Sequence, residues 1–349
     1  MNIRFALAAE VDSWNTHILA NPDGGNILQS DEFAQQKKLT GWTPRYLMAG
    51  DIALTIHEKS VFGLGKLWYI PKGPGVTTVP QVRDIVPALR AFAVKNGVFA
   101  IKIDPELPKT DDAVQAFRDL GLTPAPYIQP NISTVLLDLS PDLDTILNNL
   151  NQKGRHAIRR AERDGVTVER VPVNDSNCHA FYDLLAQTAG SQGFANSLRP
   201  YEYYQKFWQR FADARLGQMF FAYHDGQLVA GAFALVFGDK STYKDGASKR
   251  VEGAYGVTHF VQWHVMQWAK EQGSFTHDLC GSPPSSQIDN PAHPWYGVGL
   301  FKTSFNKQVT DYVGTFDIVV KPQQYKWWIK FGERAAKRLW WRKHHESWY

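Results

Sequence analysis

The chain has 349 residues, of which 44% are hydrophobic and 21% charged, with a formal net charge of +4. This length predicts two domains, and the composition is that of a globular protein with enough apolar residues for two cores. No window approaches the roughly 18 consecutive apolar residues of a membrane span, acidic residues come too early for a secretory signal, and two cysteines without metal-ligand spacing predict reduced thiols in the cytoplasm.

The first half of the chain alternates helical and extended patterns. Ser30 is a suitable N-cap for a helix that Gly41 follows. Apolar periodicity predicts helices at Val11–Leu19, Ser30–Leu39, Val82–Asn96 and Asp111–Leu120, and strands at Tyr46–His57, Gly65–Tyr69, Val98–Ile103 and Ile132–Leu137.

The second half repeats this alternation. Asp225-Gly226 is typical of a tight turn between two strands. We predict, in order, a single helix at Leu143–Gly165, strand Val166–Val171, helices Cys178–Gln187 and Tyr201–Phe211, strands Met219–His224, Leu228–Phe237 and Ser241–Gly246, helix Gly256–Gln272 and strand Phe275–Leu279.

This order of elements is that of the acyl-CoA N-acetyltransferase (GNAT) fold. The sequence therefore predicts an α/β (α+β) protein of two tandem GNAT-like domains with mixed sheets. The expected domains are 1–140 with part of 318–349, and 141–317, while 325–349 form a basic, tryptophan-rich helix or tail.

An arginine-rich segment stands out in the predicted helix of the second half. Arg155, Arg159 and Arg163 recur every four residues and would share one helix face. Such a face suits phosphate groups of a nucleotide or of tRNA, and it is equally typical of a solvated surface with Glu162 and Asp164 as neighbours. The pattern leaves both interpretations open.

Two further residues are expected where strands end, which is where ligands bind in α/β sheets. Asp278 follows an apolar run, and it would either orient an amine or act as a base, or cap the next loop. Lys302 lies between Phe301 and Thr303, and it would either reach out to solvent or be held as a fixed cation. For a lysine in general, the solvent-reaching state is the commoner one.

The tail concentrates the positive charge of the chain. Residues 325–349 hold seven Lys and Arg against two Glu, together with five of the twelve tryptophans. This mixture suits an anionic surface, either nucleic acid or lipid headgroups. Alternatively, Trp328, Phe331, Ala335 and Leu339 form the inner face of a helix that docks on the protein, with the last residues loosely held.

Several cofactor motifs do not occur in the sequence. A helix-opening Arg/Gln-x-x-Gly-x-Gly/Ala loop, which holds the pyrophosphate of coenzyme A, is missing, as are a Walker A loop, a GxGxxG turn and a His/Cys metal cluster. We therefore expect neither a metal nor a cofactor to be required.

Eight short motifs occur in one order over about 280 residues. They are Gln29-Ser30 with Lys37 and Gly41-Trp42; Lys102-x-Asp104-Pro105; Arg155–Ala161; Arg199-Pro200 with Tyr203; Tyr243 before Gly246-Ala247-Ser248; Asp278 with Gly281; Gly299-Leu300-Phe301-Lys302-x-x-Phe305; and Tyr312-x-Gly314. In this arrangement the chain resembles the Fem family of peptidoglycan peptidyltransferases.

The resemblance implies two GNAT-like domains, and the lack of a heptad insertion between Tyr203 and Tyr243 matches the compact members without a coiled-coil arm. It further implies transfer of an amino acid from aminoacyl-tRNA, as co-substrate, to the free amine of UDP-MurNAc-pentapeptide or lipid II. One departure from the family pattern is the segment 282–296, which contains four prolines.

The resemblance also implies roles for single residues. Asp104 would lie near the acceptor amine, while Lys302 and Phe301 would serve the transfer step and the tRNA acceptor end. The acceptor's diphosphate-sugar end would be bound by Lys37, Arg199, Tyr203 and Tyr243.

Other functions remain possible from the sequence. An N-acyltransferase that uses acyl-CoA or an acyl carrier would have the same double fold, and an adaptor for RNA or membranes would use the tail alone. We expect a monomer in the cytoplasm, with peripheral membrane contact through the tail.

Overall fold

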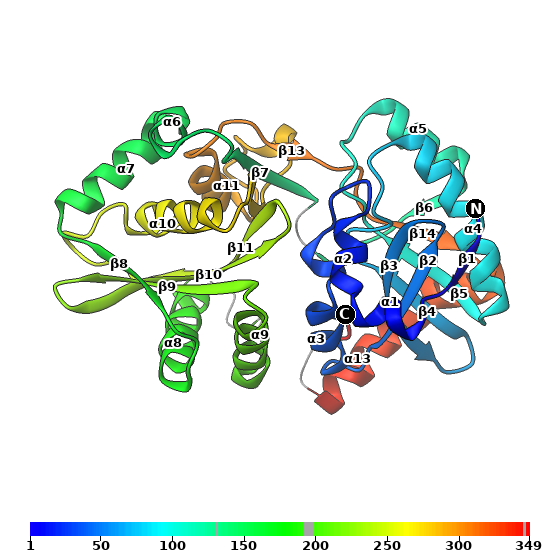
Figure 1. Cartoon of the computed structure of the whole chain (residues 1–349). Coiled ribbons are helices and arrows are strands. Elements are labelled where there is room, and N and C mark those ends of the chain that lie inside the picture. The colour runs from blue at the N-terminus through cyan, green and yellow to red at the C-terminus, as the bar shows by residue number, and fades with distance from the viewer. Residues whose placement is uncertain (130–131, 192–197, 345–346) are drawn as a thin grey trace. The chain divides into compact units, whose positions relative to one another are not determined.

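The computed structural model describes residues 1–129, 132–191, 198–344 and 347–349 (Figure 1). The chain divides into two compact units: Met1–Ile132 with Asp311–Tyr349, and Ser133–Thr310. Each unit has its own sheet and its own hydrophobic core.

The first unit is built on a mixed sheet. Its strands are β1 (Ile3–Phe5), β2 (Thr43–Ala49), β3 (Ile52–Val61), β4 (Gly65–Ile70), β5 (Val98–Ile103), β6 (Leu122–Pro124) and β14 (Phe316–Val319). Its helices are α1 (Ala8–Asp12), α2 (Trp14–Leu19), α3 (Asp31–Lys38), α4 (Val79–Lys95), α5 (Asp111–Asp119), α12 (Pro322–Trp327) and α13 (Glu333–His344), with a π-helical turn at Trp328–Gly332.

The second unit has the same kind of sheet. Its strands are β7 (Ser133–Asp138), β8 (Thr167–Val171), β9 (Gly217–His224), β10 (Gln227–Phe237), β11 (Lys240–Ser248) and β12 (Thr276–Gly281), and β13 (Thr310–Asp311) lies at its boundary. Its helices are α6 (Leu143–Asn149), α7 (Gln152–Arg163), α8 (Asp175–Ser191), α9 (Tyr201–Asp213), α10 (Val257–Glu271) and α11 (Tyr296–Thr303).

The two sheets follow one plan. Within the described residues each has seven strands, in the orders β1-β2-β3-β4-β5-β14-β6 and β8-β9-β10-β11-β12-β7-β13. In each, an antiparallel series ends in a parallel pair, β4 with β5 or β11 with β12, and a long helix connects that pair. The next strand, β14 or β7, is antiparallel and comes from a distant part of the chain. The prediction of two tandem mixed α/β domains is confirmed.

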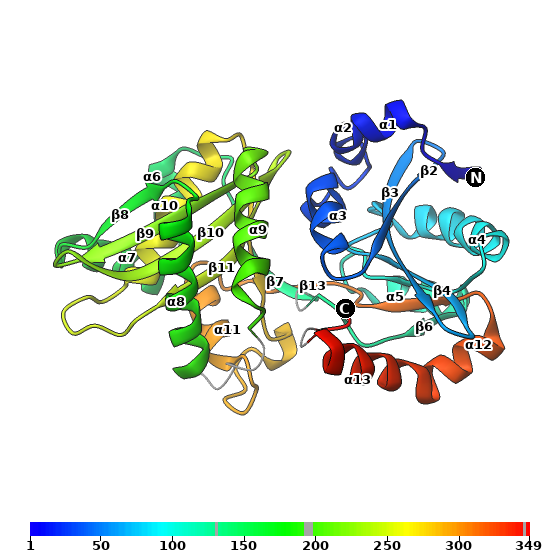
Figure 2. The ribbon, with the colours of Figure 1, turned by 90° about the horizontal axis from the view of Figure 1, so that it is seen from below.

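Alternation along β4 and β5 gives the first sheet two apolar faces. Trp68 and Ile70 join the core beneath α4 and α5, whereas Leu67 and Tyr69 join a second cluster with Trp328 of the C-terminal segment. Figure 2 shows α12 and α13 running along this sheet. In the second unit, α10 covers one face of the sheet and α8 and α9 cover the other (Figure 1).

Four element predictions were wrong in detail. The extended run at 46–57 is a hairpin of β2 and β3, because Gly50 turns the chain with a positive φ of 58°. The helix at 143–165 is interrupted at Leu150 and Asn151, and the helix at 11–19 is two short helices. The strand at 132–137, grouped by position with the first half, pairs with β12 in the second sheet.

The tail docks with a different face from the predicted one. Trp328 is buried, but Phe331 and Leu339 are exposed by 52% and 64%. The π-helical turn changes the phase of the helix, so Ala336 and Trp340 pack against the aromatic cluster instead.

The end of the chain is not loose at Trp348, which is buried. Its carbonyl accepts a hydrogen bond from the buried Lys59, whose Nζ lies 4.2–4.6 Å from the ring centres of Trp42, Trp340 and Trp348. These three indoles form a cage for the ammonium group. Across the described residues, no helix is both long enough and apolar enough to cross a membrane.

Candidate functional site

The parallel strands β11 and β12 separate at the candidate site of the second unit. Their pairing covers Lys240–Thr242 and Thr276–Asp278 and ends there. Tyr243 follows on β11, and Cys280, with a positive φ of 62°, follows on β12. The carboxyl ends of parallel strands are the usual location of ligand sites in such sheets.

Lys302 reaches this end of β12 from a helix. It lies in α11, not at a strand end as predicted, and only 7% of it is exposed. Its Nζ donates a hydrogen bond to the carbonyl of Gly281. Burial lowers the pKa of Lys302, while Cys280 and Asp278 act in the opposite direction. The side chain is therefore buried and fixed by a hydrogen bond, and the interpretation that it reaches out to solvent is wrong.

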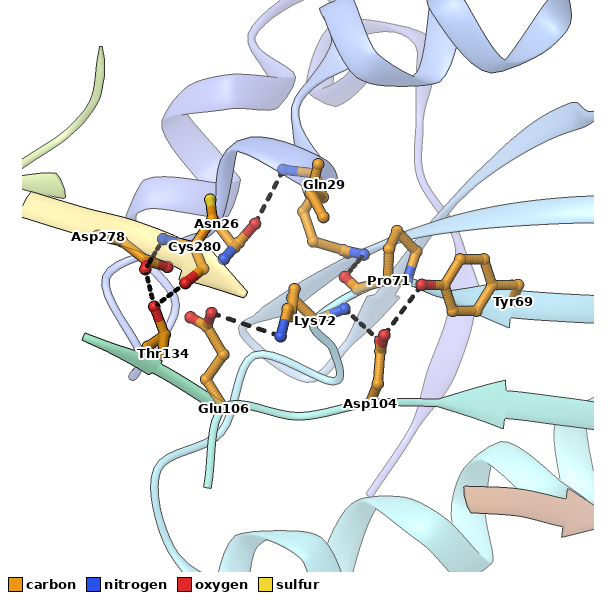
Figure 3. A network of polar contacts seen from close by, with 11 residues as sticks. Asn26, Gln29, Tyr69, Pro71, Lys72, Asp104, Glu106, Thr134, Asp278 and Cys280 are labelled. Carbon is orange, nitrogen blue, oxygen red and sulfur yellow. Dashed lines mark hydrogen bonds and ion pairs between the residues drawn. The ribbon is translucent and has the colours of Figure 1, made fainter. Parts of the chain in front are cut away.

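Asp278 stabilises the turn after β12. It accepts hydrogen bonds from Thr134 Oγ1 and, at 2.7 Å, from the backbone N–H of Cys280 (Figure 3). The loop-capping interpretation of this residue is therefore confirmed, and its carboxylate also contributes negative charge close to Lys302.

Phe301 packs on the other side of α11. Its ring contacts His259 and Phe305 at centroid distances of 4.9 and 5.3 Å. His259 bonds Ser304 at 2.8 Å, and burial lowers the pKa of the imidazole to about 4. A neutral His259 therefore positions the helix end that carries Phe301 and Lys302.

Tyr243 lies close to Cys280 as well. Burial, Asp245 and Cys280 together raise the pKa of its hydroxyl well above the usual range. The Tyr243 ring packs against Gly246, and a Cβ atom at position 246 would lie 1.5 Å from the tyrosine oxygen. Only glycine at 246 permits this placement, which accounts for the spacing of the Tyr243 motif.

Arg199 and Tyr203 form a cation–π pair at the start of α9, with 4.6 Å between the guanidinium carbon and the ring centre. Tyr203 also contacts the ring of Tyr204 at 5.8 Å. The structure thus places these two predicted binding residues in contact with each other.

A partly buried ion pair beside this group was not predicted. Lys244 Nζ lies 2.9 Å from Asp245, which also accepts a hydrogen bond from the indole of Trp208 at 3.0 Å. Asp245, Tyr204 and Tyr203 raise the pKa of Lys244 against the effect of burial. Two adjacent opposite charges directly after Tyr243, within the predicted strand 241–246, were the available signal in the sequence.

Asp104 is the centre of a polar network in the first unit (Figure 3). It follows β5, is 3% exposed, and accepts hydrogen bonds from Tyr69 Oη at 3.0 Å and the backbone N–H of Lys72 at 2.6 Å. Burial raises the pKa of Asp104 to about 6, with the Lys72 charge opposing it. A carboxyl group that ionises near neutrality is suited to proton transfer.

Lys72, Tyr69 and Glu106 around Asp104 were missed. Lys72 Nζ lies 3.9 Å from Glu106 and 5.2 Å from the ring centre of Tyr312. The buried Gln29 fixes this loop by donating to the carbonyl of Pro71 at 2.7 Å (Figure 3). The run Pro-Lys-Gly-Pro-Gly at 71–75, directly after an apolar strand, was the available signal.

Lys37 belongs to the same unit and is buried at the end of α3. Its Nζ lies 5.6 Å from the ring centre of Trp42, and its charge, after burial itself, lowers the pKa of His57. Trp42 contacts Tyr69, the partner of Asp104, at 6.4 Å. Aromatic rings thus connect Lys37 with the Asp104 network.

The three predicted arginines of α7 lie in two different environments. Arg155 donates to the carbonyls of Asn148 and Leu150 and so caps α6. Arg159 and Arg163, by contrast, line an open pocket of about 950 Å³. The other lining residues are His156, Ala157, Arg160, Glu162, Tyr255 and Gly256. Two of the three predicted arginines therefore line a cavity with an excess of positive charge.

Similar proteins agree with this architecture. The acetyltransferase (GNAT) domain family matches residues 149–285, inside the second unit. The lipid II:glycine glycyltransferase of Staphylococcus aureus (strain MRSA252) is 24% identical over 88% of this chain and 91% of the relative. FemX is 21% identical in sequence, and its crystal structure superposes with a TM-score of 0.79 over 93% of this chain and 99% of that one.

The chain is similar to a Fem protein and to lipid II:glycine glycyltransferases over most of its length. The protein is an enzyme of the acyltransferase class, as the glycyltransferase relatives and the GNAT domain agree. Its fold extends to more distant proteins, since L-PGS from Bacillus licheniformis, 16% identical, superposes with a TM-score of 0.51 over 91% of this chain.

Proposed function

We propose that this protein, like the Fem family it resembles, transfers an amino acid from aminoacyl-tRNA to the free amine of a peptidoglycan precursor, UDP-MurNAc-pentapeptide or lipid II. The observation that carries the proposal is Lys302, a buried lysine held by a carbonyl where β11 and β12 separate. The relatives named as lipid II:glycine glycyltransferases support the class of acceptor.

The reaction depends more on positioning the acceptor amine beside the ester carbonyl than on activating either group. The acceptor amine attacks the ester carbonyl, the bond to the tRNA ribose breaks, and the proton lost by nitrogen ends on the ribose hydroxyl. An aminoacyl ester is already reactive, so holding the two groups together lowers most of the barrier. The oxyanion that forms on the carbonyl is stabilised by a fixed positive charge, which we assign to Lys302.

The remaining residues receive roles by their chemistry. The diphosphate-sugar end of the acceptor is bound by Arg199, Tyr203, Tyr243 and Lys37. Asp104 lies near the free amine of the acceptor. Phe301 serves the tRNA acceptor end beside Lys302. Arg159 and Arg163 supply positive charge for RNA phosphates in the α7 pocket.

The location of the enzyme follows from its proposed substrates. It works as a cytoplasmic monomer without a cofactor, since aminoacyl-tRNA is the second substrate. A lipid-linked acceptor brings it to the inner face of the membrane, where the basic, tryptophan-rich tail makes contact.

A transfer assay tests the proposal. Purified protein is incubated with a panel of aminoacyl-tRNAs and UDP-MurNAc-pentapeptide, and the extended peptide is detected by mass spectrometry. Replacing Lys302 by Met should reduce the rate by about a hundredfold, the usual effect of losing an oxyanion contact. The exposed Lys307 provides the matched control, Lys307→Met, which should act at the wild-type rate.

Two results would contradict the proposal. Wild-type rates with Lys302→Met would remove Lys302 from the transfer step. A thermal shift with acetyl-CoA, but none with UDP-MurNAc-pentapeptide, would favour an acyl-CoA-dependent N-acyltransferase.

A further inference from the structure

The C-terminal helix carries an exposed apolar stripe. Trp327, Phe331, Ala335 and Leu339 recur every fourth residue and are all exposed, the first by 62%. Trp327 and Phe331 contact each other at a centroid distance of 5.7 Å. Exposed large apolar side chains that gather on one face of a protein mark a docking surface.

A second stripe, of basic residues, runs beside the first. Its members also recur every fourth residue and are exposed: Lys326, Lys330, Arg334, Arg338 and Arg342. Since each of the first four precedes an apolar-stripe residue by one position, the two stripes are neighbours along the helix. Glu333 is the one acidic residue of 322–344, and it is bound to Lys337 at 3.0 Å and Tyr349 at 2.8 Å.

The apolar stripe borders a groove on the same unit. Leu339 and Ala335 line this cavity of about 500 Å³ together with Phe62, which is fully exposed at the β3–β4 turn. Lys343 and His344 lie in the same lining. An apolar hollow with the cationic Lys343 in its wall fits acyl chains below negatively charged headgroups.

We infer that this face of the first unit, the apolar stripe with Phe62 and the flanking basic stripe, docks on an anionic lipid bilayer. Tryptophan, phenylalanine and leucine enter the interface while lysine and arginine meet the lipid phosphates. RNA fits less well, because only Trp327 and Phe331 of the stripe carry rings for base stacking, whereas Leu339 and Ala335 line an apolar groove. The inference extends the tail contact of the proposed function to defined residues, and it is testable without transfer activity.

Vesicle co-sedimentation of the full chain tests the inference. The wild-type protein should bind phosphatidylcholine vesicles that contain phosphatidylglycerol at least about tenfold more tightly than pure phosphatidylcholine vesicles, and less tightly as salt rises. Trp327→Ser/Phe331→Ser/Leu339→Ser should weaken this binding about tenfold or more. Lys330→Gln/Arg334→Gln/Arg338→Gln should abolish the preference for anionic lipid. All six positions are exposed, so thermal unfolding should stay unchanged.

The matched control is Phe275→Ser, an aromatic residue exposed by 58% in the other unit, which should bind vesicles like the wild type. Undiminished binding by the apolar triple variant would overturn the inference, as would absence of wild-type binding. If the wild type binds an RNA duplex but no vesicles, and only the charge variant loses RNA binding, the surface is assigned to RNA. If the wild type self-associates but binds no vesicles, and the apolar variant loses self-association, the surface is assigned to a second copy of the chain. Transfer to the soluble acceptor should be unaffected in every variant, so failure of the proposed reaction is distinguishable from failure of membrane docking.

Discussion

Burial acts on Lys302 and Asp104 through the same physical effect, the loss of water around a charge. It lowers the pKa of the lysine and raises that of the carboxyl group, so both shift toward the neutral form. Nearby groups limit the pKa shift: Cys280 and Asp278 for Lys302, and Lys72 for Asp104. Each group is therefore stabilised by few, specific contacts.

Asp104→Asn should change the pH dependence of transfer. The wild-type rate should rise as pH passes about 6, where the carboxylate forms, and the variant should be slower and lack this rise. Rates from pH 5 to 8, with the exposed Asp84→Asn as control, check the prediction. An unchanged profile in Asp104→Asn would show that this carboxyl group takes no part in proton transfer.

The same pKa shift affects stability. The folded pKa of about 6 exceeds the ordinary 3.8, so the folded state holds the proton more tightly. The free energy of unfolding should therefore decrease as pH rises from about 4 to about 6, by roughly 3 kcal/mol at most. Denaturant unfolding of the wild type and Asp104→Asn should differ by this pH-dependent contribution.

At the scale of elements, the interruption between α6 and α7 has a structural cause. Asn151 and Gly154 at the start of α7 hold the segment that follows Lys302: the N–H of Asn151 donates to Phe305 at 2.8 Å, and that of Gly154 to Ser304 at 3.0 Å. A continuous helix would lose the contact of Asn151. The break therefore supports the end of α11.

Gly154→Ala tests this contact. Alanine favours a helix over glycine by up to about 1 kcal/mol, but its Cβ would stand 2.4 Å from the carbonyl oxygen of Ser304. We expect a net loss of about 1–3 kcal/mol of unfolding free energy, measured by urea denaturation. The exposed neighbour provides the control, Lys153→Ala, which should be neutral or slightly stabilising. A more stable Gly154→Ala protein would refute the close approach.

Elements predicted from local pattern were the most accurate. The hairpin at Asp225-Gly226, the capped helix after Ser30 and the helix at 256–272 occur close to their predicted bounds. The tail was predicted less well, because a π-helical turn at 328–332 changes which residues face inward. Hydrophobic periodicity does not reveal such a turn, since the exposed stripe is apolar as well.

At the scale of the whole molecule, the chain leaves the first unit at residue 132 and returns at 311. The returning strand β14 is joined to β5 by a buried ion pair, with 2.8 Å between Lys102 and Asp317. Tyr325 of α12 donates to the same carboxylate at 2.9 Å. This network explains the cationic residue of the Lys102-x-Asp104 motif as structural.

Asp317→Leu should strongly destabilise the protein, because it leaves Lys102 buried without a counter-charge. The expected loss is about 3–5 kcal/mol of unfolding free energy in urea denaturation. Lys102→Met/Asp317→Leu should recover most of it, since no unpaired charge remains. Equal stability of the single variant and the wild type would mean that the pair contributes nothing.

Local sequence patterns were enough to predict the kinds of elements, the tandem α/β plan and the motif residues, because turns, caps and periodicity act over a few neighbouring positions. Tertiary structure decided which sheet β7 and β14 join, that Lys302 is buried on a helix, and that Lys59 is caged by three indoles. These features depend on contacts between segments up to 289 residues apart, as between Lys59 and Trp348, and only the packed chain removes the water that sets the charge of a buried group.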